Sequence, residues 1–136
     1  MDYRYLLDTN ACSELIKNPQ GKLAHQLFQI GAHRVGINWV VEAELRFGAK
    51  LKNSPPLTER VDALINELHL IDFNDQLAVH YADIRTQLTH QGQLIGANDL
   101  WIAAHARSLN LCLVTRNLSE FSRVADLQII DWFKTR

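Results

Sequence analysis

Three acidic residues, Asp8, Glu44 and Asp99, stand where a carboxylate is unexpected. Asp8 directly follows a short apolar run at residues 3–7. At 100° per residue, Glu44 falls inside the apolar stripe of a predicted helix, and Asp99 shares a helix face with Ile102 and two alanines. Removing an unpaired charge from water costs several kcal/mol. These acids are therefore expected either to pair with a basic side chain or to bind a cation.

Carboxylates that lie close together repel, and one of them must take up a proton unless a cation sits between them. Oxygen ligands favour a hard divalent cation, so the expected cofactor is Mg²⁺ or Mn²⁺. The six histidines show no HxH or HExxH spacing that would favour zinc, and we expect them on the surface or in packing contacts. The sequence also lacks a GxSxG elbow, a P-loop and a GxGxxG turn. The predicted chemistry is thus acidic and metal-dependent.

Each acid also has an ordinary structural explanation. Asp8 has the residue type and position of an N-cap for the first predicted helix. Glu44 is explained by a salt bridge to an arginine. Asp99 is explained by the helix dipole, which favours acids in the first turn, with Asn98 as the N-cap. Glu42 points away from the apolar stripe and is expected to be solvated. Taken together, these explanations require three such acids to converge by chance.

The elements that position these acids alternate along the chain between short apolar strands and amphipathic helices. Strands are predicted at residues 3–7, 34–37, 69–72, 111–115 and 127–130. Helices are predicted at residues 11–18, 21–30, 38–52, 57–68, 74–91 and 98–109, with a short helix or turn at 119–124 and a loop at 53–56. This alternation predicts a parallel sheet covered on both faces. Because ligands bind beyond the carboxyl ends of such strands, we expect Asp8 and Thr115 at the binding edge.

The composition excludes several classes of protein. The chain has 136 residues, 47% apolar and 21% charged, which suits one domain spanning residues 1–136. Its formal net charge of -1 offers no overall basic surface, so a nucleic acid must be held by a local patch. Apolar stretches are too short for a membrane span or a secretory signal, which predicts a cytoplasmic protein. Cys12 and Cys112 are expected in the core rather than in a disulfide or a zinc site.

The chain carries five motifs in order: LLDTN at 6–10, VVEAELRFGA at 40–49, IGANDLWIAAHA at 95–106, LVTRNLSEF at 113–121 and DW at 131–132. The set resembles the PIN-domain ribonucleases, specifically the VapC-type toxins of bacterial toxin-antitoxin pairs. The resemblance implies a PIN-like α/β/α sandwich with a central parallel sheet of four or five strands and about seven helices. It implies an endoribonuclease that depends on Mg²⁺ or Mn²⁺, often cuts tRNA and inhibits translation. The implied partners are a second copy, giving a homodimer, and a VapB-type antitoxin whose C-terminal segment lies across the site.

The resemblance also assigns roles to individual residues. The family's first acid matches Asp8, the Glu of its helical AEL motif matches Glu44, and the acid of its NDL motif matches Asp99. Where most members carry a fourth Asp, this chain has Asn117. Glu120 in SEF resembles the acid of members with Asn at that place and would complete the catalytic set; otherwise it is a solvated loop acid. Supporting roles are implied for Thr115, Asn117 and Asn10.

Local cations would have to hold the phosphates of a nucleic-acid substrate. The candidates are Arg46, Lys50, Lys52, Arg85 and Arg116. Arg46 and Lys50 stand four residues apart on one predicted helix and form a short basic ridge beside Glu44. Each candidate is otherwise explained as a solvated surface charge.

The indication of a homodimer from the residues themselves is a pair of amphipathic helices at 57–68 and 74–91. Together they carry more apolar face than a small sheet needs to cover it. Trp39, Trp101 and Trp132 are expected in the core rather than in an interface.

Three other functions remain open on the residues alone. A HAD-like phosphatase would use Asp8 as its nucleophile, although Asn10 stands where its second Asp is required. A signalling receiver domain needs an acidic pair after the first strand and a distant lysine, and neither is visible. A non-catalytic RNA- or protein-binding domain would leave the acids with structural roles. Only a nuclease needs Mg²⁺ or Mn²⁺ to cut unmodified RNA, so a metal titration separates these functions.

Overall fold

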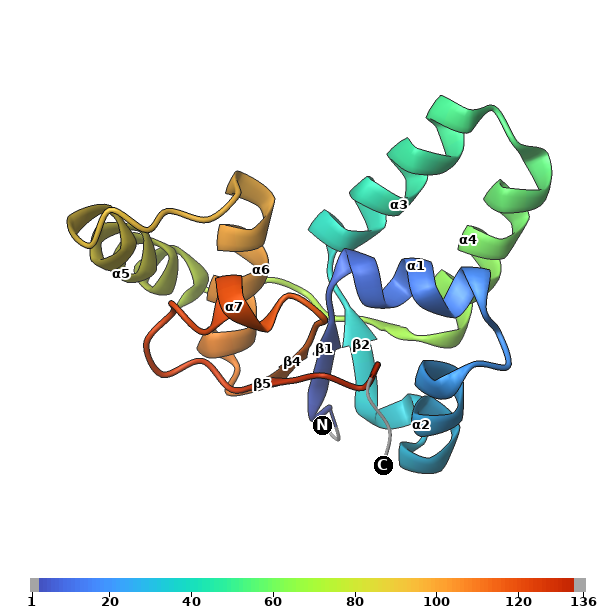
Figure 1. Cartoon of the computed structure of the whole chain (residues 1–136), viewed down its shortest axis with the longest axis horizontal. Coiled ribbons are helices and arrows are strands. Elements are labelled where there is room, and N and C mark those ends of the chain that lie inside the picture. The colour runs from blue at the N-terminus through green and yellow to red at the C-terminus, as the bar shows by residue number, and fades with distance from the viewer. Residues whose placement is uncertain (1–2, 134–136) are drawn as a thin grey trace.

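The centre of the molecule is a parallel sheet. The computed structural model describes residues 3–133, and its strands are β1 (Tyr5–Leu7), β2 (Val35–Ile37), β3 (His69–Leu70), β4 (Cys112–Val114) and β5 (Ile129–Ile130). They pair in the order β3-β2-β1-β4-β5, and every pair is parallel. The strands lie between two groups of helices (Figure 1). The predicted fold class, an α/β/α arrangement around a parallel sheet, is confirmed.

The part of the chain that the structure describes contains seven α-helices: α1 (Thr9–Lys17), α2 (Lys22–Ile30), α3 (Trp39–Lys52), α4 (Pro55–Glu67), α5 (Leu77–His90), α6 (Ala97–Ser108) and α7 (Leu118–Phe121). A 3₁₀ turn, η1 (Ala32–Arg34), precedes β2. In Figure 1, α1 to α4 lie to the right of the strands and α5 to α7 to the left. None of these helices is long and apolar enough to cross a membrane.

Short polar side chains begin three of the helices. Asp8, Asn38 and Ser54 each accept a hydrogen bond from the backbone N–H three residues later, at the start of α1, α3 and α4. The two prolines after Ser54 occupy the first turn of α4, where a missing N–H breaks no helical hydrogen bond. The predicted loop at 53–56 is therefore shorter than expected, because its prolines belong to the helix.

Two further predictions about helix ends had different outcomes. Gly92 follows α5 with a left-handed φ of 64°, as its position predicted. Asn98, in contrast, is not an N-cap. Gly96 holds that position, and α6 begins at Ala97, so the Asn98 side chain is free to bind elsewhere.

Apolar side chains from the strands and the helices on both sides form the core. Among the tryptophans, Trp132 is buried, and Trp101 is partly buried with its ring stacked 3.9 Å from that of Tyr81. Trp39 is 55% exposed, so the prediction that it lies in the core is wrong. As the first residue of α3 it stands outside the buried face of that helix and packs beside Phe73. Both cysteines are free; Cys12 is buried and the other is partly exposed.

The order of the strands reverses the direction of the chain connections at the carboxyl edge of the sheet. From β1 the chain moves to β2 and β3 on one side, and it then crosses to β4 and β5 on the other. Connections that leave β1 and β4 therefore diverge, which is where ligands of such sheets bind. The backbone N–H of Asp8 donates to the carbonyl of Val114 at 3.1 Å and holds these two strand ends together.

Gly36 in β2 is a position where this packing admits no side chain. A Cβ there would lie 2.6 Å from Cγ1 of Ile71 and 3.0 Å from the carbonyl oxygen of His69. We expect Gly36→Ala to lower the free energy of unfolding by about 1–3 kcal/mol, because overpacking forces neighbouring groups to shift. Chemical denaturation measures this change.

Gly48→Ala in α3 is the matched control. A Cβ at Gly48 meets nothing within 4 Å, and alanine in a helix is more favourable than glycine by up to about 1 kcal/mol. A Gly36→Ala protein as stable as the wild type would contradict the packing of β2 against the segment after β3.

Candidate active site

Asp8 lies at the carboxyl end of β1 and is 3% exposed. Its Oδ1 accepts a hydrogen bond from the backbone N–H of Ala11 at 2.8 Å, and its carboxylate also accepts one from Thr115. Burial raises the pKa of Asp8, these two hydrogen bonds partly offset the increase, and the charges of Glu44 and Glu120 add to it. Asp8 therefore caps α1 and at the same time lies among other acids.

Glu44 connects α3 to α1 and α6. Its carboxylate accepts a hydrogen bond from the hydroxyl of Thr9 and another, of 3.1 Å, from the side-chain amide of Asn98. The ion pairs found within residues 3–133 do not include Glu44. The alternative explanation of a salt bridge to an arginine is therefore wrong, because both contacting residues are neutral donors.

Asp99, in the first turn of α6, meets Glu120 of α7. Burial and a hydrogen bond between the two carboxyl groups raise the pKa of Asp99 to about 7, and the charges of Glu120, Asp8 and Glu44 act in the same direction. Glu120 also accepts the backbone N–H of Gly96 at 3.3 Å. A hydrogen bond between two carboxyl groups requires a proton on one of them. Without a cation, the cluster therefore retains a proton close to neutral pH.

Thr115 and Asn117 order the segment that follows β4. Thr115 is fully buried, and its Oγ1 accepts the backbone N–H of Asn117 at 2.9 Å. The side-chain amide of Asn117 donates to Glu120. Asn10 is exposed in the first turn of α1. Asn117, which stands where the resemblance expects a fourth Asp, thus contacts Glu120.

Four carboxylates, from the N-terminus of α1 and from α3, α6 and α7, converge at this edge of the sheet. In the described range 3–133, none of the four forms an ion pair. As the side chains stand, no three His, Cys, Asp or Glu residues in that range surround one metal position. Glu44 and Glu120 are held on hydrogen-bond donors of the protein instead. The donor set itself, all oxygen with uncompensated charge, fits Mg²⁺ or Mn²⁺.

The predicted basic ridge on α3 is largely neutralised. Arg46 Nε lies 2.8 Å from Glu42, and a second guanidinium nitrogen lies 2.8 Å from Asp62 of α4. Glu42 points away from the core, as predicted, and its 24% exposed side chain pairs with Arg46 at the surface. Lys50 is exposed.

Of the three remaining candidate phosphate ligands, Lys52 is exposed at the end of α3. Arg85 and Arg116 contact aromatic side chains. Arg85 donates to the hydroxyl of Tyr81 at 2.9 Å on the exposed side of α5. Arg116 follows Thr115 directly, and its guanidinium lies 3.9 Å from the ring centroid of Phe133. Of these two, Arg116 is next to a residue of the acidic site.

Sequence reasoning missed the residues that hold Glu44 in place. Thr9 directly follows Asp8, and Asn98 directly precedes Asp99, so both partners lie in the LLDTN and NDL motifs. A polar residue beside each inward-facing acid was the available signal. That signal did not show that Thr9 and Asn98 both donate to Glu44.

Comparison with known proteins decides the family. Residues 5–127 match the PIN domain. The chain is a PIN-domain protein. The Haemophilus influenzae protein Ribonuclease VapC1 is 38% identical over 132 residues, covering 96% of this chain and 98% of that protein. The Salmonella typhimurium tRNA(fMet)-specific endonuclease VapC is 35% identical over 130 residues, covering 95% and 98%.

The fold agrees with that of solved relatives. A chain in the crystal structure of VapBC2 from Rickettsia felis, bound to a promoter DNA fragment, superposes with a TM-score of 0.85 at 32% identity, covering 94% of this chain and 98% of that one. This PIN domain therefore belongs with the VapC ribonucleases, as its five motifs indicated. The phosphatase and receiver-domain alternatives have no further support.

We expect Asp99→Asn to leave the stability of the metal-free PIN domain unchanged or to raise it. Because the pKa of Asp99 is higher in the folded than in the unfolded protein, its contribution to stability is full below pH 4 and is lost as the pH rises to about 7. The half-exposed site screens this effect below the ~1.4 kcal/mol per pH unit of a buried group. Denaturation with EDTA present, at pH 5 and pH 8, measures it.

The matched control is Asp75→Asn, which changes an exposed acid outside the site. Asp75→Asn should change the free energy of unfolding by the same amount at pH 5 and at pH 8. A large loss of metal-free stability in Asp99→Asn at pH 8 would contradict the repulsion between the four carboxylates and favour a structural role for Asp99.

Proposed function

We propose that this VapC-type PIN domain is an endoribonuclease that requires Mg²⁺ or Mn²⁺. The observation that supports the proposal most directly is the convergence of Asp8, Glu44 and Asp99, without a basic partner among residues 3–133, at the carboxyl edge of the sheet. Such a site is complementary to a divalent cation, and through it to a phosphodiester.

Asp8, Glu44 and Asp99 would hold the cation through their carboxylate oxygens. A bound divalent cation supplies Lewis-acid chemistry, lowering the pKa of a water ligand and neutralising charge on the scissile phosphate. Asp99 would have to be deprotonated to hold the cation, which its raised pKa makes harder than for an ordinary aspartate. Glu120 would accept a proton from the attacking water, and Thr115 would orient Asp8.

We infer that the substrate is RNA, probed first as tRNA, because one relative is named a tRNA(fMet)-specific endonuclease. The proposed phosphate contacts are three exposed basic residues. Arg116 lies beside Thr115 of the site, Lys50 lies on α3, and Arg85 lies on α5. Arg46 would have to leave Glu42 and Asp62 to serve in this way. We further propose that the protein acts in the cytoplasm as a growth-inhibiting toxin.

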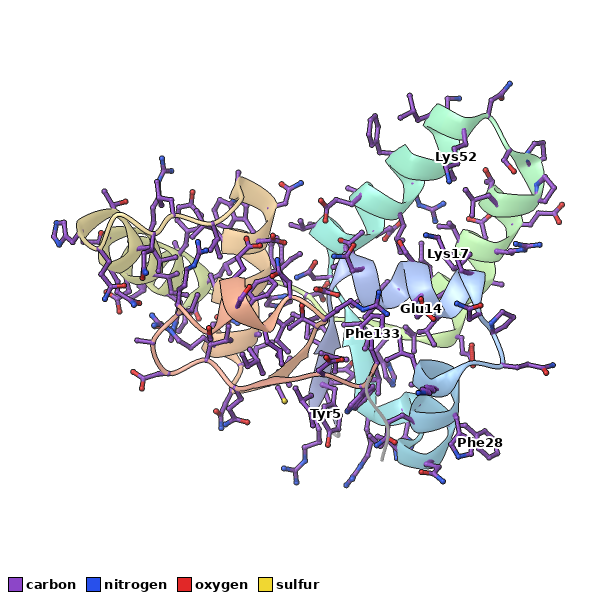
Figure 2. All side chains as sticks on the ribbon, viewed as in Figure 1. Tyr5, Glu14, Lys17, Phe28, Lys52 and Phe133 are labelled. Carbon is purple, nitrogen blue, oxygen red and sulfur yellow. The ribbon has the colours of Figure 1, made fainter. Side chains whose placement is uncertain are left out.

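The proposed partners are a second copy of the chain and a VapB-type antitoxin. The two helices predicted to form the dimer, α4 and α5, direct most of their large apolar side chains into the core, although Val79 of α5 is 56% exposed. The most exposed large apolar side chains lie on α2 and α3: Phe28 (85% exposed), Phe47 (65%) and Leu51 (71%). Phe28 projects outward from α2 (Figure 2). Surfaces of this kind favour protein partners.

Asp8→Asn and Asp99→Asn are expected to lower RNA cleavage by at least about 100-fold, since even residues that only orient metal ligands contribute 10–100-fold. Expression of either variant should no longer arrest growth. Cleavage of total small RNA by purified protein measures the first effect. Glu42→Gln, which changes a neighbouring acid on α3 that is paired with Arg46, should retain cleavage. Full toxicity of either Asp variant would refute the site.

Cleavage is expected to stop in EDTA and to return with Mg²⁺ or Mn²⁺. Because the nucleophile is water rather than the RNA 2′-hydroxyl, the products should carry a 5′-phosphate and a 3′-hydroxyl. Mapping of the end groups tests this directly. Cyclic phosphate ends, or undiminished cleavage in EDTA, would be incompatible with the proposed chemistry.

A further inference from the structure

Two fully buried polar side chains join α3 to α6 beneath the acidic site. Asn38 and His105 are both 0% exposed, and Asn38 Nδ2 lies 3.1 Å from His105 Nδ1. The other ring nitrogen, Nε2, lies 3.0 Å from the backbone carbonyl oxygen of Asp72, between β3 and α5. In the part of the chain that the structure describes, the other buried polar side chains are Asp8 and Thr115, and both belong to the site.

The donors and acceptors of this bridge allow one arrangement. Asn38 Oδ1 accepts the backbone N–H of Val41 at 3.0 Å and caps α3, so Nδ2 must face the histidine as a donor. His105 Nδ1 is then the acceptor, and its Nε2–H donates to the carbonyl of Asp72. If the Asn38 amide were flipped, its NH₂ group would face the backbone N–H of Val41, and two donors would meet without an acceptor. The bridge is therefore directional.

The bridge stands at the same distance along both helices from the carboxylates. Asn38 precedes Glu44 by six residues and His105 follows Asp99 by six residues, which is about 9 Å along a helix. At the site itself, the 3.1 Å hydrogen bond from Asn98 to Glu44 joins the same two helices. Two connections at different heights fix the separation and the relative rotation of α3 and α6.

Capping of α3 explains why Asn38 is polar, but stability alone gives little reason for its buried partner to be a histidine. Replacing both partners of a buried hydrogen bond by apolar groups of similar shape is often nearly neutral for stability. A satisfied polar bridge differs from an apolar contact in imposing one orientation on its members. Phe73 adds to this restriction by packing edge-on against the His105 ring, with centroids 4.8 Å apart.

We propose that Asn38 and His105 are positioning residues, which hold α3 and α6 so that Glu44 and Asp99 meet at the spacing a divalent cation requires. The inference rests on the proposed function. Asn38 and His105 are fully buried, each six residues along its helix from the acid it would position. They would therefore act through Glu44 and Asp99 rather than by contacting the metal or the RNA. Loss of an interaction that orients metal ligands typically weakens metal binding about 10–100-fold.

Two substitutions of His105 separate its two hydrogen bonds. His105→Asn keeps an acceptor near the place of Nδ1, facing Asn38. His105→Gln keeps a donor near the place of Nε2, facing the carbonyl of Asp72. We expect His105→Gln to weaken Mn²⁺ binding about 10-fold, measured by titration calorimetry of the metal-free protein. His105→Asn should stay close to the wild type.

The kinetic effects should divide in the same way. His105→Gln is expected to lower kcat for RNA cleavage and leave KM unchanged, because the bridge acts on the metal ligands and not on RNA. Asn38→Ser keeps a capping hydroxyl for α3 but does not reach the histidine, so it should resemble His105→Gln. The double variant should bind Mn²⁺ no more weakly than either single variant, since both remove the same hydrogen bond.

The matched control is His80→Gln. His80 Nδ1 accepts from Arg107 Nε at 2.9 Å, a hydrogen bond that joins α5 to α6 away from the site. This variant should bind Mn²⁺ like the wild type. Circular dichroism and thermal unfolding establish that each protein is folded at the assay temperature. Should His105→Gln fail to fold, Mn²⁺ binding by Asn38→Ser tests the bridge instead.

The outcomes separate the bridge from the proposed function. A folded His105→Gln or Asn38→Ser protein with wild-type Mn²⁺ affinity would show the bridge to be purely structural and overturn the inference. A wild type that binds Mn²⁺ but cuts no RNA would overturn the proposed function instead, while the metal titrations still test the bridge. A wild type that binds no Mn²⁺ would contradict both.

Discussion

Repulsion between carboxylates at a half-buried edge of the sheet is the constraint on which the arrangement of this PIN domain depends. Four acids meet there without a basic partner in the described chain. The pKa of Asp99 is raised as a result, and neutral donors surround Glu44 and Glu120. Under the proposed function, a divalent cation would take over the role of these donors and favour the ionised form of Asp99. The topology makes the meeting possible, because the connections after β1 and β4 leave in opposite directions.

The two explanations of Asp8 prove to be compatible. The same carboxylate caps α1 and faces the other acids, so the hydrogen bond that begins the helix also fixes the acid at the strand end. Asn38 repeats this pattern on α3, where the cap is joined to His105 and through it to α6. Helix capping, which is ordinarily a matter of local stability, here also places the elements that carry the site.

Local patterns predicted most of the architecture, because strand and helix periodicity and the rules for parallel sheets depend on short stretches of sequence. The faces of Glu44 and Asp99 followed from helical geometry in the same way. Contacts between distant segments were not accessible, which is why the partners of Glu44 and Arg46 were missed. Trp39 was misplaced for a related reason, since a helix face does not reveal whether a neighbouring segment covers it.

The most direct measurement is the anomalous difference density of crystals of the protein grown with Mn²⁺. A site built around carboxylate repulsion should show a manganese peak about 2 Å from oxygens of both Asp8 and Asp99. Rotation of Glu44 away from Thr9 and Asn98 toward that peak would accompany it. Strong manganese density elsewhere in the molecule, with none between these two carboxylates, would contradict a metal-dependent site at this edge of the sheet.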